Sequence, residues 1–182
     1  MLSGPARGAA VRSPAVARIL IVAGGCRGRR LAGELVAEGH AVRVTTRTEA
    51  GRVAIETTGA EAWVGTPERL GTLRAALESV TIVCWLLGAL TGSEEEVRAL
   101  HGTRLEFFLG QVIDTTVRGF IYEAAGVTVA EEILAAGERI VRTAGERNAI
   151  PVAFLKADLE EPEVWQAEAQ ATVAGLLGGS PG

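Results

Sequence analysis

Short apolar runs alternate with amphipathic segments along almost the whole chain, and this alternation favours a parallel sheet covered by helices. The first run, Arg18–Ala23, is apolar at every position after its first residue. Such a run is typical of a strand that is covered on both faces. Further strands are expected at Ala41–Thr46, Ala62–Val64, Thr81–Leu87, Arg118–Tyr122 and Pro151–Leu155. Successive strand–helix units predict an α/β fold of the Rossmann type: a doubly wound parallel sheet of about six strands, ordered 3-2-1-4-5-6, with helices on both faces.

The expected helices lie between these strands. Gly39 suits the C-terminal end of the first helix, and Leu70, Leu73 and Leu77 have the spacing of an apolar helical stripe. Ser93 followed by Glu96 forms a capping box that predicts a long fourth helix to about Asp114. The other helices are expected over Glu49–Thr57, around Ile133–Ala144 and from Pro162 to about Leu177.

Length and composition limit the kind of protein this can be. The chain has 182 residues, the size of one domain, which we place at 17–178 between a disordered leader (1–16) and a flexible tail (179–182). A net charge of -4 with no Lys/Arg stripe argues against nucleic acid as a partner. No apolar run reaches the ~20 residues of a membrane span, and the leader lacks the apolar core of a secretory signal. We therefore expect a cytoplasmic protein with no membrane contact.

The two cysteines, Cys26 and Cys84, are too few for a disulfide framework, and their spacing is not that of metal ligands. No metal site is expected. Cys26 lies at a predicted helix start, where the pKa of a thiol tends to fall. A redox pair with Cys84 on the neighbouring strand is an alternative that the sequence leaves open.

The turn from Gly24 to Gly28 joins the first strand to the first helix, which is the position of a dinucleotide-binding glycine motif. Glycines there let the backbone approach a pyrophosphate, and the free N–H groups and dipole of the helix start favour its charge. The alternative is a tight turn with only a structural role. The expected cofactor-binding residues are Gly24, Gly25, Cys26, Arg27, Gly28, Arg29, Arg47, Leu87 and Gly88.

The segment ILIVAGGCRGRRLAGELVAEGHAVRVTTRT resembles the atypical short-chain dehydrogenase/reductases, especially the NmrA-like, epimerase-like and small flavin/biliverdin-reductase-like groups. These families show GxxGxxG, a helix ending in Gly-His and a strand ending in Arg. Counting back from Gly39 places Gly28 on the third glycine and Gly25 on the second. The first glycine falls on Val22, unless the loop is one residue shorter and Gly24 serves instead.

The resemblance continues in GAEAWVGTPERLGTLRAALESVTIVCWLLG and covers roughly Arg18 to Leu155. Gly65-Thr66 stands where the family usually has Gly-Asp, so the usual acidic contact near the adenine is missing. The resemblance implies a nicotinamide cofactor.

Arg47 indicates which nicotinamide cofactor to expect. An acid at this place, about 20 residues after the glycine turn, binds the ribose 2′-hydroxyl of NAD, whereas an arginine suits a 2′-phosphate. Arg27 and Arg29 could add positive charge to the same site. NADP(H) is therefore expected in preference to NAD(H). The alternatives are that Arg47 is an ordinary solvated side chain, or that nearby Glu49 weakens the preference.

The catalytic Tyr–Lys pair of short-chain dehydrogenases, four residues apart on a helix, is absent. The only tyrosine, Tyr122, and the only lysine, Lys156, are separated by 34 residues on different strands. Tyr122 and Glu123 lie at the predicted carboxyl end of the fifth strand and remain weak catalytic candidates, as does Lys156. Each could equally be a structural or solvated residue.

Two functions from different classes follow. One is a small NADPH-dependent reductase that works without the Tyr–Lys pair, because hydride transfer needs chiefly a positioned cofactor and acceptor. The other is a non-catalytic NADP(H) sensor or interaction protein. The fourth helix is apolar around more of its circumference than one sheet face can cover, so we also expect a homodimer through helices four and five.

Overall fold

The computed structural model describes residues 16–179, and within them six parallel strands form one sheet in the order β3-β2-β1-β4-β5-β6. This confirms the predicted Rossmann-type fold class and strand order. The strands are β1 (Arg18–Ala23), β2 (Ala41–Thr46), β3 (Glu61–Val64), β4 (Ile82–Leu86), β5 (Gly119–Glu123) and β6 (Val152–Leu155). The helices are α1 (Gly25–Ala37), α2 (Glu49–Glu56), α3 (Glu94–Leu100), α4 (Thr103–Val112), α5 (Glu131–Asn148) and α6 (Pro162–Gly178).

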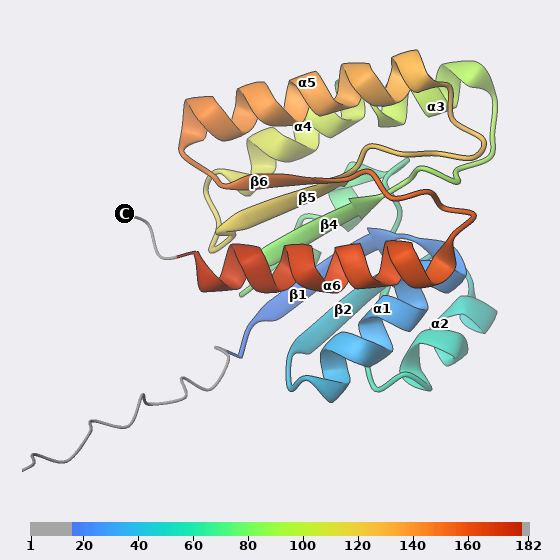
Figure 1. Ribbon diagram of the computed structural model, residues 1–182, viewed down its shortest axis with the longest axis vertical. Helices are drawn as coiled ribbons and strands as arrows, with labels where there is room; N and C mark the ends of the chain where they lie inside the picture. Colours follow the sequence, from blue (N-terminus) through green and yellow to red (C-terminus); the bar gives the residue numbers. More distant parts are fainter. Residues whose placement is uncertain (1–15, 180–182) are drawn as a thin grey trace, which may run out of the picture.

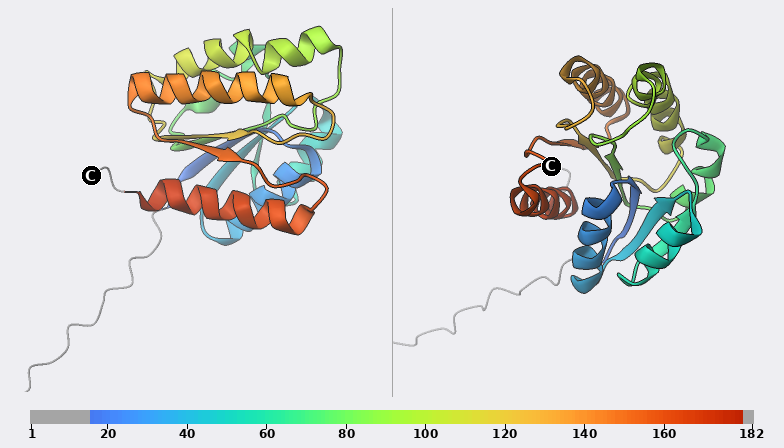
Figure 2. Two further views of the ribbon diagram at one scale, coloured as in Figure 1. Left: turned by 45° about the horizontal axis from the view of Figure 1, so that its top comes forward. Right: turned by 90° about the vertical axis from the view of Figure 1, so that its right-hand side faces the viewer.

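Helices cover both faces of the sheet, with α1, α2 and α6 on one side and α4 and α5 on the other (Figures 1 and 2). The two central strands supply both cores, because alternate residues of a strand point to opposite faces. In β1, Ile19 and Ile21 enter one core, whereas Leu20 and Val22 enter the other. A strand that is buried on both faces is what the continuous apolar run predicted.

The third predicted helix is wrong. Two short 3-10 turns stand there instead, η1 (Leu70–Thr72) and η2 (Ala75–Leu77), with Leu73 between them. Leu73 and Leu77 still pack under the sheet beside β4 and α4. The apolar spacing therefore identified the buried side chains correctly but overestimated the regularity of the backbone.

The predicted long fourth helix is broken into α3 and α4 at His101 and Gly102. The capping box of Ser93 and Glu96 opens α3 as expected, with both reciprocal hydrogen bonds present. A Cβ on Gly102 would lie 2.8 Å from the carbonyl oxygen of Arg98. The helical backbone is interrupted at Gly102, which has φ -121° and ψ -108°, and α4 begins at Thr103.

Residues 1–15 and 180–182, which hold nearly all of the expected leader and tail, lie outside the described residues. Within residues 16–179, no helix is both long enough and apolar enough to cross a lipid bilayer.

Candidate functional site

The glycine-rich turn is built so that α1 begins very close to the end of β1. Gly24 has a left-handed φ of 87° and donates its N–H to the carbonyl of Leu86 on β4 at 3.0 Å. A Cβ on Gly28 would lie 2.9 Å from the carbonyl oxygen of Ala23, and one on Gly24 would lie 2.8 Å from the Cα of Gly28. Gly24 and Gly28 therefore have a steric role in closing the turn.

Gly25 has a different role, because it faces open space. Its φ is 54°, and a Cβ built on it would meet nothing within 4 Å. The N-cap of α1 receives no side-chain hydrogen bond, so the first N–H groups of the helix are left for another acceptor. The turn thus fits a diphosphate, which needs close backbone approach and N–H donors at a helix N-terminus.

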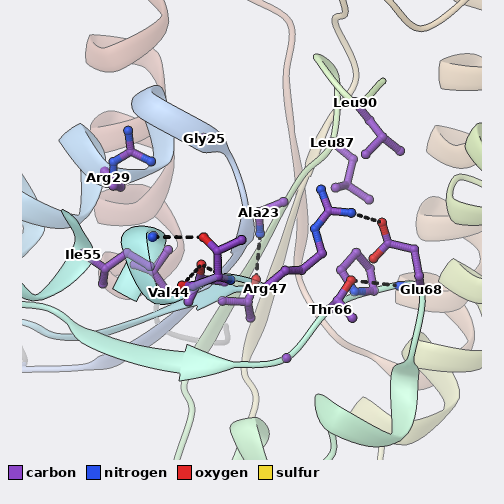
Figure 3. Close-up of a pocket in the computed structure, with 16 residues that line it drawn as sticks. Ala23, Gly25, Arg29, Val44, Arg47, Ile55, Thr66, Glu68, Leu87 and Leu90 are labelled. Atoms are coloured by element: carbon purple, nitrogen blue, oxygen red, sulfur yellow. Dashed lines mark hydrogen bonds and ion pairs between the residues drawn. The ribbon is translucent and has the colours of Figure 1, made fainter. Parts of the chain in front are cut away.

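A pocket of about 270 Å³ lies beside this turn, at the carboxyl ends of β1, β2, β3 and β4 (Figure 3). This is where the strand order reverses, the position at which doubly wound sheets bind ligands. Its volume lies just below the ~300–1,000 Å³ of typical small-molecule sites, so it suits one nucleoside half of a dinucleotide. The predicted residues that line the pocket are Gly25, Arg29, Arg47 and Leu87.

Arg47 extends across the pocket from the end of β2 and forms an ion pair with Glu68, from the loop after β3 (Figure 3). Arg47 Nη1 lies 3.2 Å from Glu68 Oε1, and the side chains are 68% and 32% exposed. Of the charged residues in the described chain, Arg29, Arg47 and Glu68 line this pocket. Glu49, the acid considered from the sequence, pairs with Arg52 on α2 at 4.0 Å and does not line it.

Two other predicted cofactor residues, Arg27 and Gly88, contact a buried carboxylate, that of Glu123 at the end of β5. Glu123 Oε2 accepts the Gly88 N–H at 2.6 Å, and Oε1 accepts from Arg27 Nη2 at 3.3 Å and from Trp165 Nε1 of α6 at 3.0 Å. Burial raises the pKa of Glu123, against the opposing effects of Arg27 and the two N–H donors. Arg27 and Gly88 are therefore engaged with Glu123 and do not line the pocket.

Tyr122 lies in the core on the α4–α5 side of the sheet. Its hydroxyl is 2.6 Å from His101 Nδ1 and donates to the carbonyl of Leu134 at 3.3 Å. Burial raises the pKa of Tyr122 well above its usual range and lowers that of His101 to about 4. Tyr122 is thus part of a buried hydrogen-bonded pair and does not line the pocket.

Lys156 follows β6 and is not brought to Tyr122. Its Nζ forms an ion pair with Glu138 of α5 at 3.1 Å, and its side chain is 62% exposed. The structure therefore keeps the two residues apart, as their separation in the sequence indicated.

The two cysteines occupy different environments. Cys26 is exposed in the first turn of α1, where Arg29 Nη2 lies 3.0 Å from its Sγ. Cys84 is buried in β4, and burial raises its pKa to about 12. Both thiols are free. In the described part of the chain, no three His, Cys, Asp or Glu residues are grouped as metal ligands would be.

The sequence did not predict a role for three residues of this region: Glu68, Trp165 and Thr45. Thr45 Oγ1 accepts the N–H of Ala23 at 3.0 Å and so fixes the start of the glycine turn against β2. Trp165 lies 42 positions from Glu123, and Glu68 lies 21 positions from Arg47. The position of Trp165 at the start of the last helix was the only available signal, and it did not indicate its partner.

Comparison with solved structures supports the fold. The structure of BdcA (YjgI) from E. coli has a TM-score of 0.69 at 13% identity, over 89% of this chain and 92% of that one. WbmG from Bordetella bronchiseptica, in complex with NAD, has a TM-score of 0.63 at 19% identity, over 80% of this chain and 54% of that one. UDP-glucose 4-epimerase from Thermotoga maritima, with UDP-glucose, has a TM-score of 0.63 at 15% identity, over 76% and 54%.

The chain spans about half the length of most of these structures, BdcA being an exception. No protein-family model and no curated protein sequence matches the chain. The identities are low enough that these likenesses establish a Rossmann fold of the kind found in nucleotide-sugar epimerases and reductases, and nothing finer.

Proposed function

We propose that this protein binds a nicotinamide dinucleotide, with NADP(H) preferred over NAD(H), as a member of the atypical short-chain dehydrogenase group. The observation that carries the proposal is the pocket at the strand-order reversal, with the open Gly25 turn at one end and Arg47 at the other. The diphosphate would lie on the first turn of α1 and the adenosine half in the pocket.

Arg47 supports the choice of cofactor. Its guanidinium is exposed in the pocket, and Arg29 adds a second positive charge on the α1 side. A 2′-phosphate accepts charge-assisted hydrogen bonds from a guanidinium, which a neutral hydroxyl receives only weakly. Thr66 stands where the resembling families usually have an aspartate, and the acid that lines the pocket on this loop is Glu68.

The reaction that this crevice suits best is the reduction of a small acceptor molecule by the bound cofactor. The bound cofactor would supply a hydride, and the chain would bind and orient it beside an acceptor, with the proton drawn from solvent. A second hollow of about 410 Å³, between the β4–α3 and β5–α5 loops, meets the cofactor pocket at Leu90. Val97 and Ile133 give it an apolar wall that an acceptor could occupy.

A non-catalytic NADP(H) sensor is the second candidate, and one observation favours it. The catalytic candidates at the end of β5 have no free atom for proton transfer, since both oxygens of Glu123 are engaged and the Tyr122 hydroxyl is buried against His101. Incubation with NADPH and a panel of quinones, flavins and aldehydes separates the two. Loss of the cofactor's near-ultraviolet absorbance with any acceptor identifies a reductase, and none with any acceptor favours the sensor.

Calorimetric titration tests cofactor choice. We expect NADPH to bind more tightly than NADH, by ~1.5–3 kcal/mol from contacts between Arg47 and the 2′-phosphate. Arg47→Ala should remove this difference. Arg52→Ala is the matched control, because Arg52 is also an exposed, ion-paired arginine but does not line the pocket. Equal affinities in the wild type, or an unchanged preference in Arg47→Ala, would contradict the proposal.

A further inference from the structure

Glu68 is the one negative charge among the described residues that line the candidate cofactor pocket, and it is paired with the arginine on which cofactor choice depends. Glu68 Oε1 lies 3.2 Å from Arg47 Nη1 (Figure 3). Arg47 is 68% exposed, so its guanidinium is free to turn toward a ligand, but only by giving up this contact. A 2′-phosphate and Glu68 would therefore compete for the same guanidinium.

The glutamate is held more firmly than the arginine. Its backbone N–H donates to Thr66 Oγ1 at 3.4 Å, and its carbonyl oxygen accepts a hydrogen bond from Arg104 of α4. Only 32% of its side chain is exposed. Arg47, whose side chain is the more exposed of the two, is therefore the partner with more freedom to turn toward a ligand.

The second oxygen of this carboxylate has no partner. Glu68 Oε2 is buried and makes no hydrogen bond to any described residue. A buried acceptor without a donor is unfavourable by itself. Because Oε2 is buried, a ribose 2′-hydroxyl would meet this carboxylate at Oε1, the oxygen that faces Arg47. The hydroxyl can donate a hydrogen bond there, whereas a phosphate cannot and is repelled.

A further hollow of about 420 Å³, on the other side of this ion pair, adjoins the candidate cofactor pocket. Arg47 and Glu68 line both hollows, and Arg69 is added on the far side. The pair therefore stands at the boundary between two spaces, and either ribose substituent would meet both of its charges.

We propose that Glu68 sets the cofactor selectivity of this pocket by holding Arg47, so that the preference for a 2′-phosphate is smaller than a free arginine would give. This inference rests on the proposed function. It assigns to Glu68 a specificity role: Arg47 binds the 2′-phosphate of NADP(H), and Glu68 restrains that binding and accepts the 2′-hydroxyl of NAD(H). The pocket accordingly admits both cofactors.

The test uses fragments that occupy only the adenosine half, adenosine 2′,5′-bisphosphate and adenosine 5′-monophosphate, beside whole NADPH and NADH. Glu68→Gln keeps the shape of the side chain and removes its charge. We expect it to raise the preference for the 2′-phosphorylated ligand about three- to fivefold, the upper part of the range for a partly exposed ion pair. The gain should come from tighter binding of the phosphorylated ligand together with weaker binding of the other. Glu68→Asp, which keeps the charge but retracts it, should give a smaller gain and serves if Glu68→Gln does not fold.

Two comparisons make the result specific. Glu56→Gln removes an exposed carboxylate that pairs with Arg52 at 2.9 Å away from the pocket, and it should leave the preference unchanged. In an Arg47→Ala background, Glu68→Gln should no longer tighten binding of the phosphorylated ligand, because Glu68 restrains that binding through Arg47; only the weaker binding of the unphosphorylated ligand should remain. An undiminished gain in that background would overturn the inference.

The failure of this inference differs from the failure of the proposed function. If folded wild-type protein binds neither fragment nor either dinucleotide, both fall together. If the ligands bind and the preference is the same in the wild type and in folded Glu68→Gln, only the role of Glu68 is wrong. Melting curves of each variant establish that it is folded before it is titrated.

Discussion

Tyr122 lies where a catalytic residue would be expected, but its contacts are those of a structural residue. Its place at the end of β5 suggested chemistry, yet its hydroxyl lies 2.6 Å from His101 Nδ1 inside the core. Tyr122→Phe should lower the free energy of unfolding by ~1–3 kcal/mol, because it leaves a buried nitrogen without a partner. Any turnover should fall less than about tenfold, below the 10²–10⁴-fold effect of a placed acid.

Urea unfolding and steady-state kinetics of the same Tyr122→Phe preparation measure the two effects. Lys156→Ala is the comparison, since an exposed substitution usually changes stability by less than about 0.5 kcal/mol. A hundredfold loss of turnover in folded Tyr122→Phe protein would instead identify Tyr122 as the acid.

His101 gives the fold a dependence on pH. Burial lowers its pKa from 6.5 to about 4 in the folded protein, so between these values the unfolded chain binds a proton that the folded chain does not. The contribution of neutral, buried His101 to the free energy of unfolding is therefore fully present above pH 6.5 and is lost as the pH falls toward 4. The shift corresponds to at most about 3 kcal/mol. The free energy of unfolding, measured by denaturant titration at several pH values in this window, should depend less on pH in His101→Asn than in the wild type. The same pH dependence in both proteins would show that His101 is not the titrating group.

At the residue scale, the sequence predicted where a residue lies in the fold better than it predicted which side chain that residue contacts. Arg47 was expected beside the cofactor because its distance from the glycine turn is a property of the chain, and it does line the pocket. Glu68 was missed because its contact with Arg47 depends on how the loop after β3 folds back. Gly88 was expected to contact cofactor, but its N–H is taken by Glu123, which lies 35 residues further along the chain.

At the scale of the elements, strands were predicted closely and two helices were not. A strand buried on both faces leaves a continuous apolar run, so β1 begins and ends where the sequence placed it. The bounds of β2 are also as predicted, although this strand includes Arg43 and two threonines. The break between α3 and α4 was missed although the apolar pattern stops at His101-Gly102-Thr103, where a glycine suits a helix end. The backbone leaves the helical conformation at Gly102, and a Cβ there would lie 2.8 Å from the carbonyl oxygen of Arg98.

The packing of α5 on β5 depends on Gly137. A Cβ there would lie 2.1 Å from the hydroxyl of Tyr122 and 3.0 Å from the carbonyl oxygen of His101. Gly137→Ala should therefore destabilise the protein by ~1–3 kcal/mol through overpacking, despite the better helix propensity of alanine.

Gly175 of α6 is the matched control, because a Cβ there meets nothing within 4 Å. Gly175→Ala should stabilise the protein by ~0.5–1 kcal/mol through helix propensity alone. Denaturant midpoints of the two variants should therefore move in opposite directions. If both rise, α5 does not pack on Tyr122 as closely as described.

At the scale of the whole molecule, the doubly wound sheet gathers the ends of four strands into one crevice while burying their middles in two separate cores. The fold therefore separates the groups that hold the protein together from those that face a ligand. Glu123 joins the two sets, because it connects the glycine turn, β4 and α6 through Arg27, Gly88 and Trp165. On the opposite face of the sheet, helices α4 and α5 leave a surface with exposed apolar side chains.

That surface is the groove between α4 and α5, about 410 Å³ in volume, beside the exposed apolar residues of α4. Phe107 is 62% exposed and Ile113 is 46% exposed. We predict a homodimer through these two helices, because association would remove this apolar area from water. Ile113→Arg should disrupt it, whereas Val53→Arg, at a 56% exposed site on α2, should not. Light scattering up to high micromolar concentration should give twice the chain's 19.0 kDa for the wild type and Val53→Arg. A wild-type monomer throughout that range would refute the dimer.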